Sequence, residues 1–334
     1  MAISDINLPT AAPAFLASCG WEGAEVRALS GDASFRRYFR VFKDDNSALL
    51  MDAPPPREDP RSFVAMAQYL TGIGLNAPHI YHSDLSHGLL LIEDFGDDQM
   101  RQIIDADIAS EERHYRGVVD VLLELQRHAP PSWLEVHGMS HWLDEVELFI
   151  DWYGSSVGLS LDSASFRAAW EAVLAPIEHD SLPWVTELRD YHAENVMLVA
   201  GASGIGQYGL LDFQDARIGH PAYDLVSMLQ DARRDVTPTV EAQMLDYYIA
   251  QTARGQAFVD AYWVLGAQRN TRILGVFCRL SRRDGKQHYT SFQPRMWGLL
   301  ERDLAQPVLA PVKAWFDAHI PAHLRADFWI GVNQ

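Results

Sequence analysis

Residues 188–213, LRDYHAENVMLVAGASGIGQYGLLDF, hold two short apolar runs separated by a polar, glycine-rich segment. The runs at 196–200 and 208–213 are typical of buried strands, and the GASGIG segment between them is typical of a turn. Pairing the two runs as a hairpin places Asn195, at the start of the first strand, beside Asp212, near the end of the second. The stretch therefore predicts a hairpin with two oxygen-donor side chains at its open end.

A third polar residue, Asp190, precedes Asn195 by five positions and falls in a loop. Taken alone, Asp190 and Asn195 would more often be turn or capping residues. The three residues together, flanking a hairpin, predict a phosphoryl-transfer centre. Asp190 suits the carboxylate that a reacting hydroxyl needs. Asn195 and Asp212 suit a hard cation, since Mg²⁺ takes oxygen ligands and usually keeps waters beside one or two carboxylates.

The composition is that of an ordinary globular protein, with 334 residues, 48% hydrophobic and 22% charged. The net charge of −18 argues against a nucleic-acid partner. No apolar run approaches the length of a membrane span, and the first twenty residues lack a secretory signal. The two cysteines, Cys19 and Cys278, predict neither a disulfide framework nor a metal cluster. We expect a cytoplasmic monomer that binds small molecules and neither nucleic acid nor membranes.

The front of the chain is rich in strand patterns. Prolines introduce a helix at 8–20, and Phe63, Met66, Ala67 and Leu70 mark one face of a second helix at 61–71. Five strands are expected around these helices, at 25–31, 36–42, 48–53, 79–84 and 88–95. From residue 96 onward the pattern is mostly helical apart from the hairpin, as in 111–128. We therefore predict an α+β fold with two lobes, residues 1–95 and residues 96–334.

The spacing Asp-x₄-Asn followed by Asp-Phe resembles the catalytic and metal-binding loops of protein kinase-like enzymes. The version LRDYHAENVML…LLDFQDARIGHPAYDL is similar to the aminoglycoside phosphotransferase family, which includes choline, homoserine and fructosamine kinases. The resemblance covers nearly the whole chain. It implies a bilobal protein kinase-like fold, with a small N-terminal antiparallel five-stranded sheet as nucleotide clamp and a larger, mainly helical C-terminal lobe.

The same resemblance implies roles for individual residues and two cofactors, ATP and Mg²⁺. Asp190 would be the base for the acceptor hydroxyl, and Asn195 and Asp212 would be the Mg²⁺ ligands. Asp224, in GHPAYDL (219–225), corresponds to an aspartate that braces the catalytic loop from a helix start. A plain helix cap is the alternative for Asp224.

Two segments of the front lobe are candidates for nucleotide contacts. GDASFRRYFRV (31–41) lies where the family has its phosphate-covering loop, although its single Gly31 is not a G-x-G-x-x-G motif. The end of the fifth strand lies where the family's hinge meets adenine. A plain turn and a polar interdomain turn are the respective alternatives. The candidate contacts are Ser34, Arg36, Arg37, Glu93 and Phe95.

The sequence departs from the family at two positions. The third strand carries Met51 where kinase-like enzymes have a phosphate-binding lysine, and the nearby Lys43 falls in the preceding turn. Leu188 replaces the histidine that usually stands two residues before the catalytic aspartate. These gaps raise the alternative of a nucleotide-binding regulator without turnover, against which the intact catalytic and metal-binding residues argue.

The acceptor is expected to meet polar residues of the helical lobe. Basic segments at 230–235 and 268–272 favour a neutral or anionic acceptor over a polycationic aminoglycoside. Of the pair Arg233 and Arg234, we expect one to be exposed to solvent. The alternative for His192 is a role in packing or capping. The substrate-binding candidates are His192, Asp215, Asp231, Arg233 and Arg269, with Arg234, Asn270 and Arg272 as further polar residues of the same kind.

A closer resemblance agrees with this acceptor. GDASFRRYFRV, ALLMDAPPP, LRDYHAEN and QRNTRILGVFCRL together look like the anomeric N-acetylmuramate/N-acetylglucosamine kinases of Gram-negative cell-wall recycling, in which the Met-Asp-Ala-Pro-Pro strand is ordinary. It implies transfer of the ATP γ-phosphate to the C1 hydroxyl of the sugar, with an arginine for the lactyl carboxylate of N-acetylmuramate. The alternatives are a related kinase acting on homoserine, choline or an aminoglycoside, and the non-catalytic regulator.

Overall fold

A computed structural model describes residues 7–29 and 35–325 of the chain. Its backbone contacts divide it into two compact units, each made of two separate segments. Unit 1 comprises Met1–Ser110 and Glu194–Ala216, and unit 2 comprises Glu111–Ala193 and Arg217–Gln334. This division differs from the expected lobes of residues 1–95 and 96–334, because it groups the hairpin with the front sheet.

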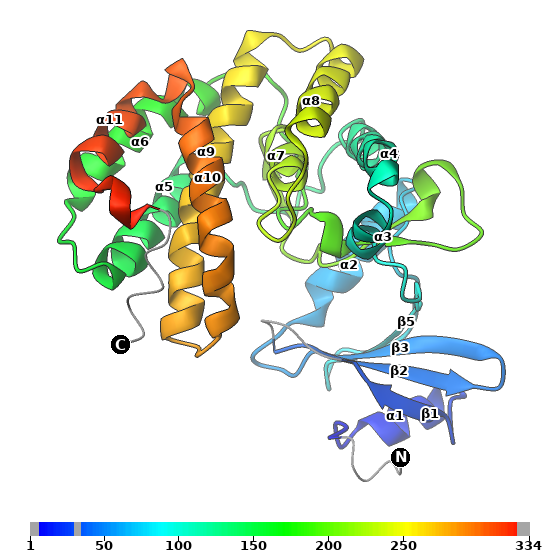
Figure 1. Cartoon of the computed structure of the whole chain (residues 1–334). Coiled ribbons are helices and arrows are strands. Elements are labelled where there is room, and N and C mark those ends of the chain that lie inside the picture. Colours follow the sequence, from blue (N-terminus) through cyan, green and yellow to red (C-terminus); the bar gives the residue numbers. More distant parts are fainter. Residues whose placement is uncertain (1–6, 30–34, 326–334) are drawn as a thin grey trace. The chain divides into compact units, whose positions relative to one another are not determined.

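Unit 1 is built on a five-stranded antiparallel sheet in the order β1-β2-β3-β5-β4 (Figure 1). All five expected strands are present: β1 Glu25–Ala28, β2 Arg37–Lys43, β3 Asn46–Asp52, β4 Ile80–Asp84 and β5 Leu89–Ile92. The first helix, α1 (Ala12–Ser18), packs Phe15 and Leu16 against one face of the sheet, where Phe39 and Val41 of β2 are buried. Alternating burial along β2 is what a strand with one covered face requires.

Unit 1 also contains α2 (Pro60–Gly72) and α3 (Met100–Ala106). Asp59 caps α2 by accepting a hydrogen bond of 3.0 Å from the Arg61 N–H, and Pro60 occupies the first helical position. The predicted apolar face of this helix is confirmed, since Phe63, Met66, Ala67 and Leu70 are all buried.

The hairpin predicted from the opening stretch is confirmed as β7 (Val196–Leu198) paired antiparallel with β8 (Tyr208–Leu210). Both of its outer edges bond to other parts of unit 1. The Leu210 N–H donates to the Asn76 carbonyl at 2.8 Å, and the Leu198 N–H donates to the Asp98 carbonyl at 2.7 Å. These bonds explain why the hairpin belongs to unit 1 although it is remote from the sheet in sequence.

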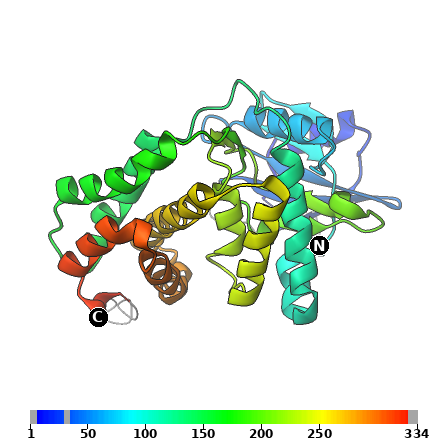
Figure 2. The same ribbon diagram turned by 90° about the horizontal axis from the view of Figure 1, so that it is seen from above.

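Unit 2 is mainly helical and is organised around the longest helix, α9, which packs against α5, α7 and α10. Figures 1 and 2 both show α9 and α10 side by side. Gly275 permits close packing of α9, since a Cβ at this position would lie 2.4 Å from the Leu148 carbonyl oxygen. The helices are α4 (Glu111–Leu125), α5 (Met139–Leu148), α6 (Ser163–Glu178), α7 (Tyr223–Leu229), α8 (Pro238–Thr252), α9 (Gln256–Arg282), α10 (Gln293–Leu304) and α11 (Ala310–His319).

A two-stranded sheet of unit 2 was not anticipated from the sequence. β6 (Val185–Glu187) pairs antiparallel with β9 (Arg217–Gly219), so that Glu187 stands opposite Arg217. Strands of three residues are too short to be recognised from an alternation of apolar and polar residues. The pair matters because β6 leads directly into the segment that carries Asp190. Within the described residues, no helix has the length and apolarity needed to cross a membrane.

Candidate active site

The backbone of the loop after β6 is fixed by Asp224, the residue predicted to brace it. Asp224 lies in the first turn of α7, is 2% exposed, and accepts hydrogen bonds from the N–H groups of Leu188 at 2.6 Å and Arg189 at 2.9 Å. Arg189 has φ +69°, a left-handed conformation that costs about 1–2 kcal/mol for a residue with a Cβ. Burial and the neighbouring Glu187 charge raise the pKa of Asp224 to about 8, against the effect of the two N–H donors.

The carboxylate of Asp190, the predicted base, is half-buried in unit 2. Burial raises its pKa, but the positive charges of Arg272 and Arg269, together with His192, outweigh burial and leave the pKa below its ordinary value. Asp190 is therefore ionised at neutral pH. An ionised carboxylate of this kind accepts a hydrogen bond from a hydroxyl group and orients it.

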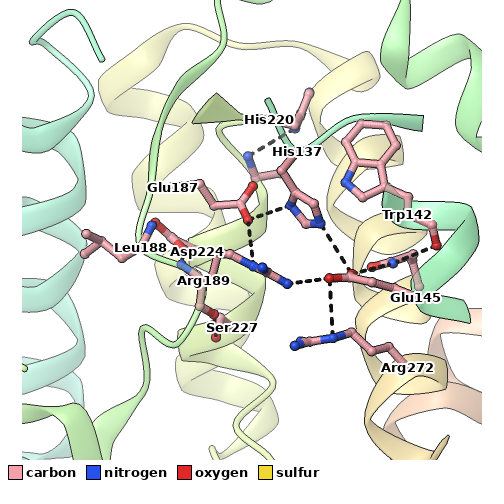
Figure 3. A network of polar contacts seen from close by, with 12 residues as sticks. His137, Trp142, Glu145, Glu187, Leu188, Arg189, His220, Asp224, Ser227 and Arg272 are labelled. Carbon is pink, nitrogen blue, oxygen red and sulfur yellow. Dashed lines mark hydrogen bonds and ion pairs between the residues drawn. The ribbon is translucent and has the colours of Figure 1, made fainter. Parts of the chain in front are cut away.

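Behind this loop lies a network of charged side chains centred on Glu145 of α5 (Figure 3). Oε1 of Glu145 pairs with the guanidinium of Arg189 and lies 3.5 Å from Nε of Arg272. Oε2 lies 3.3 Å from Nε2 of His137 and accepts a hydrogen bond of 3.1 Å from Gln268. Glu145 thus ties the side chain next to Asp190 to helix α9, and these surroundings hold its own pKa below the ordinary value despite burial.

His137 joins Glu145 to Glu187, whose Oε1 lies 2.7 Å from Nδ1 of the ring. Burial disfavours the charged imidazole, but the two carboxylates prevail and raise its pKa to about 9. Gly219 is required here, because a Cβ would lie 1.9 Å from Oε2 of Glu187. His137, Glu145 and Glu187 were not expected from the sequence. The one available signal was a charged residue inside an apolar run, as Glu187 is in VTEL.

Several of the predicted acceptor residues lie in unit 2 around the same loop. The Arg233 guanidinium lies 2.8 Å from Nε2 of His192, whose pKa is lowered by burial. Asp231 accepts hydrogen bonds from the N–H groups of Arg233 at 2.8 Å and Ala193 at 3.3 Å. Arg269 is 4% exposed and donates to the Gln230 carbonyl at 3.2 Å. Burial and hydrogen bonding therefore fix most of these side chains in place.

Two expectations about this region need correction. Neither arginine of the 233–234 pair is exposed: Arg233 is half-buried, and Arg234 is buried in an ion pair of 2.5 Å with Glu111. Asn270 is fully buried and donates to Gln230 at 2.7 Å and Asp303 at 2.9 Å, so it packs between helices. In both cases a partner distant in the sequence engages the polar group, in place of the solvent expected for an arginine of the pair and the acceptor expected for Asn270.

Unit 1 carries the two predicted metal ligands. The Leu211 N–H donates to the Asn195 carbonyl at 2.9 Å, which extends the hairpin pairing toward Asp212. Asp212 has φ +56°, and its Oδ1 accepts hydrogen bonds from Gln214 at 2.8 Å and Arg36 at 2.9 Å. The buried Oε1 of Gln214 has no hydrogen-bond partner among the described residues. Amide and carboxylate oxygens here fit the donor set of Mg²⁺.

The described part of the chain contains no group of three or more His, Cys, Asp and Glu side chains able to hold a metal ion. A cation at Asn195 and Asp212 would therefore take its other ligands from water or phosphate oxygens, which is the usual arrangement for Mg²⁺ in kinases. Asp215, predicted to contact the acceptor, is an exposed residue of unit 1 whose Oδ2 lies 3.3 Å from Nε2 of Gln214.

The predicted nucleotide residues of unit 1 differ in how they are held. Arg36 contacts Asp212, whereas Arg37 is engaged by the buried Asp52 of β3 at 2.6 Å. Glu93 hydrogen-bonds to His79 through both its backbone N–H and its side-chain carboxylate. Phe95 is buried against Gly209, where an added Cβ would lie 2.6 Å from the Phe95 ring. Ser34 lies outside the described residues. Met51 is buried, and the Lys43 ammonium donates to the Gly20 carbonyl at 2.7 Å.

The sequence matches the model of the phosphotransferase enzyme family over residues 25–262. The chain belongs to this family. Among its curated relatives, the N-acetylmuramate/N-acetylglucosamine kinase of Caulobacter vibrioides is 37% identical over 355 residues, covering 93% of this chain and 96% of the relative. The kinase of the same name from Pseudomonas aeruginosa is 33% identical over 318 residues, covering 91% of this chain and 92% of the relative.

Solved structures agree with the phosphotransferase fold. A choline/ethanolamine kinase family protein from Mesorhizobium loti superposes with a TM-score of 0.61 at 14% identity, covering 91% of this chain and 96% of that one. The ADP-bound aminoglycoside phosphotransferase APH(2'')-Ib gives a TM-score of 0.60 at 14% identity, covering 88% and 97%. The expected kinase-like fold is confirmed. This small-molecule phosphotransferase shares with its family the use of ATP.

Proposed function

We propose that this phosphotransferase transfers the γ-phosphate of ATP, with Mg²⁺, to the anomeric C1 hydroxyl of N-acetylmuramate, N-acetylglucosamine or both, as a step in peptidoglycan recycling. The observation that carries the proposal is the similarity, over nearly the full length of the chain, to kinases named for these two sugars. The ionised Asp190 carboxylate supports the reaction type, because a sugar hydroxyl needs such a group to accept its proton.

In the proposed reaction Asp190 orients the C1 hydroxyl and accepts its proton. A bond forms between the C1 oxygen and the γ-phosphorus, while the bond between that phosphorus and the bridging oxygen of ADP breaks. Phosphoryl transfer depends mainly on positioning and charge stabilisation. Asp224, through its bonds to the Leu188 and Arg189 amides, fixes the backbone from which Asp190 projects.

The nucleotide contacts in this proposal come from unit 1. Of the two adjacent arginines we assign Arg36 to the phosphate oxygens, because it contacts the proposed metal ligand Asp212, whereas Asp52 of the sheet holds Arg37. Backbone groups around Glu93 and Phe95 would meet the adenine. Asn195 and Asp212 would hold Mg²⁺, which when bound neutralises charge on the phosphates. The role that a strand lysine plays in related kinases would fall to Arg36, whose contact with Asp212 keeps it beside the metal ligand.

A substrate panel tests the proposal. Purified protein is incubated with ATP, Mg²⁺ and, separately, N-acetylmuramate, N-acetylglucosamine, homoserine, choline and kanamycin, and ADP release is followed. We expect ADP with one or both sugars only, and phosphorus NMR of the product should show coupling of the phosphate to the proton on C1. ADP with homoserine or choline alone refutes the assignment. ATP binding without turnover on any acceptor favours a regulator.

A substitution of the predicted base tests its role in the chemical step separately from nucleotide binding. Asp190→Asn keeps the size of the side chain but removes the proton acceptor, so turnover should fall by about 10²–10⁴-fold. ATP affinity, measured by titration calorimetry, should stay within about twofold, because the nucleotide contacts are assigned elsewhere. Retention of activity in this variant excludes Asp190 as the base.

A further inference from the structure

The two proposed acceptors differ in charge, because N-acetylmuramate carries a carboxylate on its lactyl ether and N-acetylglucosamine carries none. A kinase that accepts the charged sugar needs a positively charged side chain near the base that remains available for hydrogen bonding. Arginine suits this task, because its planar guanidinium binds both oxygens of a carboxylate. The arginines of unit 2 around Asp190 are Arg189, Arg233, Arg269 and Arg272.

Three of these arginines are already engaged by the protein. Arg189 pairs with Glu145, and its side chain is 15% exposed. Arg233 contacts the His192 ring at 2.8 Å. Arg269 is 4% exposed and is bonded to the Gln230 carbonyl at 3.2 Å. In each of them a terminal guanidinium nitrogen is already used in a contact within the protein.

Arg272 differs from these three. It follows Arg269 by one turn of α9, and its side chain is 23% exposed. Its only ion pair joins Nε to Oε1 of Glu145 at 3.5 Å, and within the described residues neither of its terminal nitrogens makes a hydrogen bond. Figure 3 shows the Nε side of the guanidinium facing Glu145. The Nη1 and Nη2 groups therefore retain their donor capacity.

Arg272 is not the only counter-charge of Glu145, although it is the charge that lowers the pKa of that carboxyl most. Its carboxylate is already bound by the guanidinium of Arg189 and by His137, which is charged at neutral pH because two carboxylates raise its pKa to about 9. Gln268 supplies a further hydrogen bond at 3.1 Å. The contact at 3.5 Å thus orients the guanidinium without using its donor groups on the other side.

Arg272 also lies close to the predicted base, because it shares Oε1 of Glu145 with Arg189, the residue next to Asp190. Of the charges that lower the pKa of Asp190, that of Arg272 is the largest. An acceptor whose C1 hydroxyl meets Asp190 therefore comes within reach of this guanidinium. A partly buried cation beside the base, in a protein with a net charge of −18, is a specific feature of the site and not a property of the whole surface.

We propose that Arg272 binds the carboxylate of N-acetylmuramate through Nη1 and Nη2 and thereby sets the preference of the enzyme between the two sugars. The inference rests on the proposed function and specifies its acceptor subsite. With N-acetylglucosamine bound, water would occupy the same two donors. Arg272 is then a specificity-determining residue, because only the charged sugar uses its two terminal donors, whereas its effect on the pKa of Asp190 is common to both sugars.

The test compares both sugars in matched variants. Arg272→Gln should lower kcat/KM for N-acetylmuramate about tenfold to a hundredfold more than kcat/KM for N-acetylglucosamine, as expected for loss of a charge-assisted hydrogen bond to the carboxylate. The loss of its charge beside Asp190 acts on both sugars alike and cancels in this ratio. Arg272→Lys should recover part of the loss, because it keeps the charge without the paired donors. Arg283→Gln is the control; Arg283 is exposed at the end of the same helix and pairs with Asp284.

A modified substrate makes the test independent of any effect on folding. The methyl ester of N-acetylmuramate lacks the negative charge, so the unaltered protein should use it about tenfold to a hundredfold less well than the acid, and Arg272→Gln should use the acid and the ester alike. Equal loss for both sugars, no loss for either, or equal use of acid and ester by the unaltered protein overturns the inference alone. Absence of activity on both sugars overturns the proposed function and this inference together.

Discussion

Replacing Asp224 with Ala would remove the acceptor of two backbone hydrogen bonds at once, those from the Leu188 and Arg189 amides at 2.6 and 2.9 Å. Asp224 is 2% exposed, so water cannot readily take its place. A buried N–H left without a partner costs about 1–3 kcal/mol. The variant therefore loses about 2–6 kcal/mol from the loop that carries Asp190, and it also loses the bonds that hold Arg189 in its left-handed conformation.

Asp224→Asn provides a graded comparison, because the amide keeps one acceptor oxygen and leaves one N–H unsatisfied, at a cost of about 1–3 kcal/mol. If this cost appears as displacement of Asp190 from its working position, kcat falls about fivefold to a hundredfold, since 1.36 kcal/mol corresponds to tenfold. The Ala variant should fall further. ATP affinity should change less than twofold in both.

The assay is steady-state ADP release with the best acceptor, alongside urea unfolding to obtain the free energy of each variant. Asp246→Asn, at an exposed position of α8, is the control and should match the unaltered protein in both measurements. The Asn variant keeps the test decisive if the Ala variant does not fold, since whole domains are stable by only about 5–15 kcal/mol. A well-folded Asp224→Asn protein with unchanged kcat would falsify the bracing role.

Two further predictions concern the metal ligands and the buried histidine. Asp212→Asn should raise the Mg²⁺ concentration needed for half-maximal activity and for tight binding of ATP by about tenfold or more, because it removes a charged oxygen ligand; Asp215→Asn, at the exposed neighbouring carboxylate, should not. The pKa of His137 is raised from 6.5 to about 9, so its stabilising charge is fully present below pH 6.5 and is lost as pH rises through 9. The unfolding free energy should fall over that range by up to about 3 kcal/mol, and His137→Gln should remove this part of the slope. Equal slopes for the two proteins would contradict the assignment.

The sequence was sufficient for features that depend on local pattern. The apolar face of α2 follows from residues spaced three and four apart, and the hairpin follows from two runs and a turn within one stretch. The charged network could not be predicted in this way. Arg189 meets Glu145 across 44 positions, and His137 meets Glu187 across 50. Periodicity shows which residues are buried but not which buried charges find one another.

The same limit explains the wrong expectation for Arg233 and Arg234. Two adjacent arginines in a polar segment predict at least one solvated side chain, but Glu111 lies 123 positions earlier and supplies a buried counter-charge for Arg234. Arg272 illustrates the reverse case. Its residue type was noticed in the sequence, and only its unused donors and its effect on Asp190 distinguish it from the arginines around it.

Unit 1 consists of two segments that are far apart in the sequence, and this affects the order in which its parts appear during synthesis on the ribosome. Asn76 and Asp98 present backbone carbonyls whose hydrogen-bond partners are Leu210 and Leu198. A ribosome that has finished the five-stranded sheet must still synthesise Glu111–Ala193, which belongs to the other unit, before those partners exist. Domains tend to fold as units during synthesis, and closing a long intervening loop is slow. The carbonyls of Asn76 and Asp98 therefore lack these partners until the hairpin has been synthesised, so that unit 1 is completed only after most of unit 2's first segment has left the ribosome.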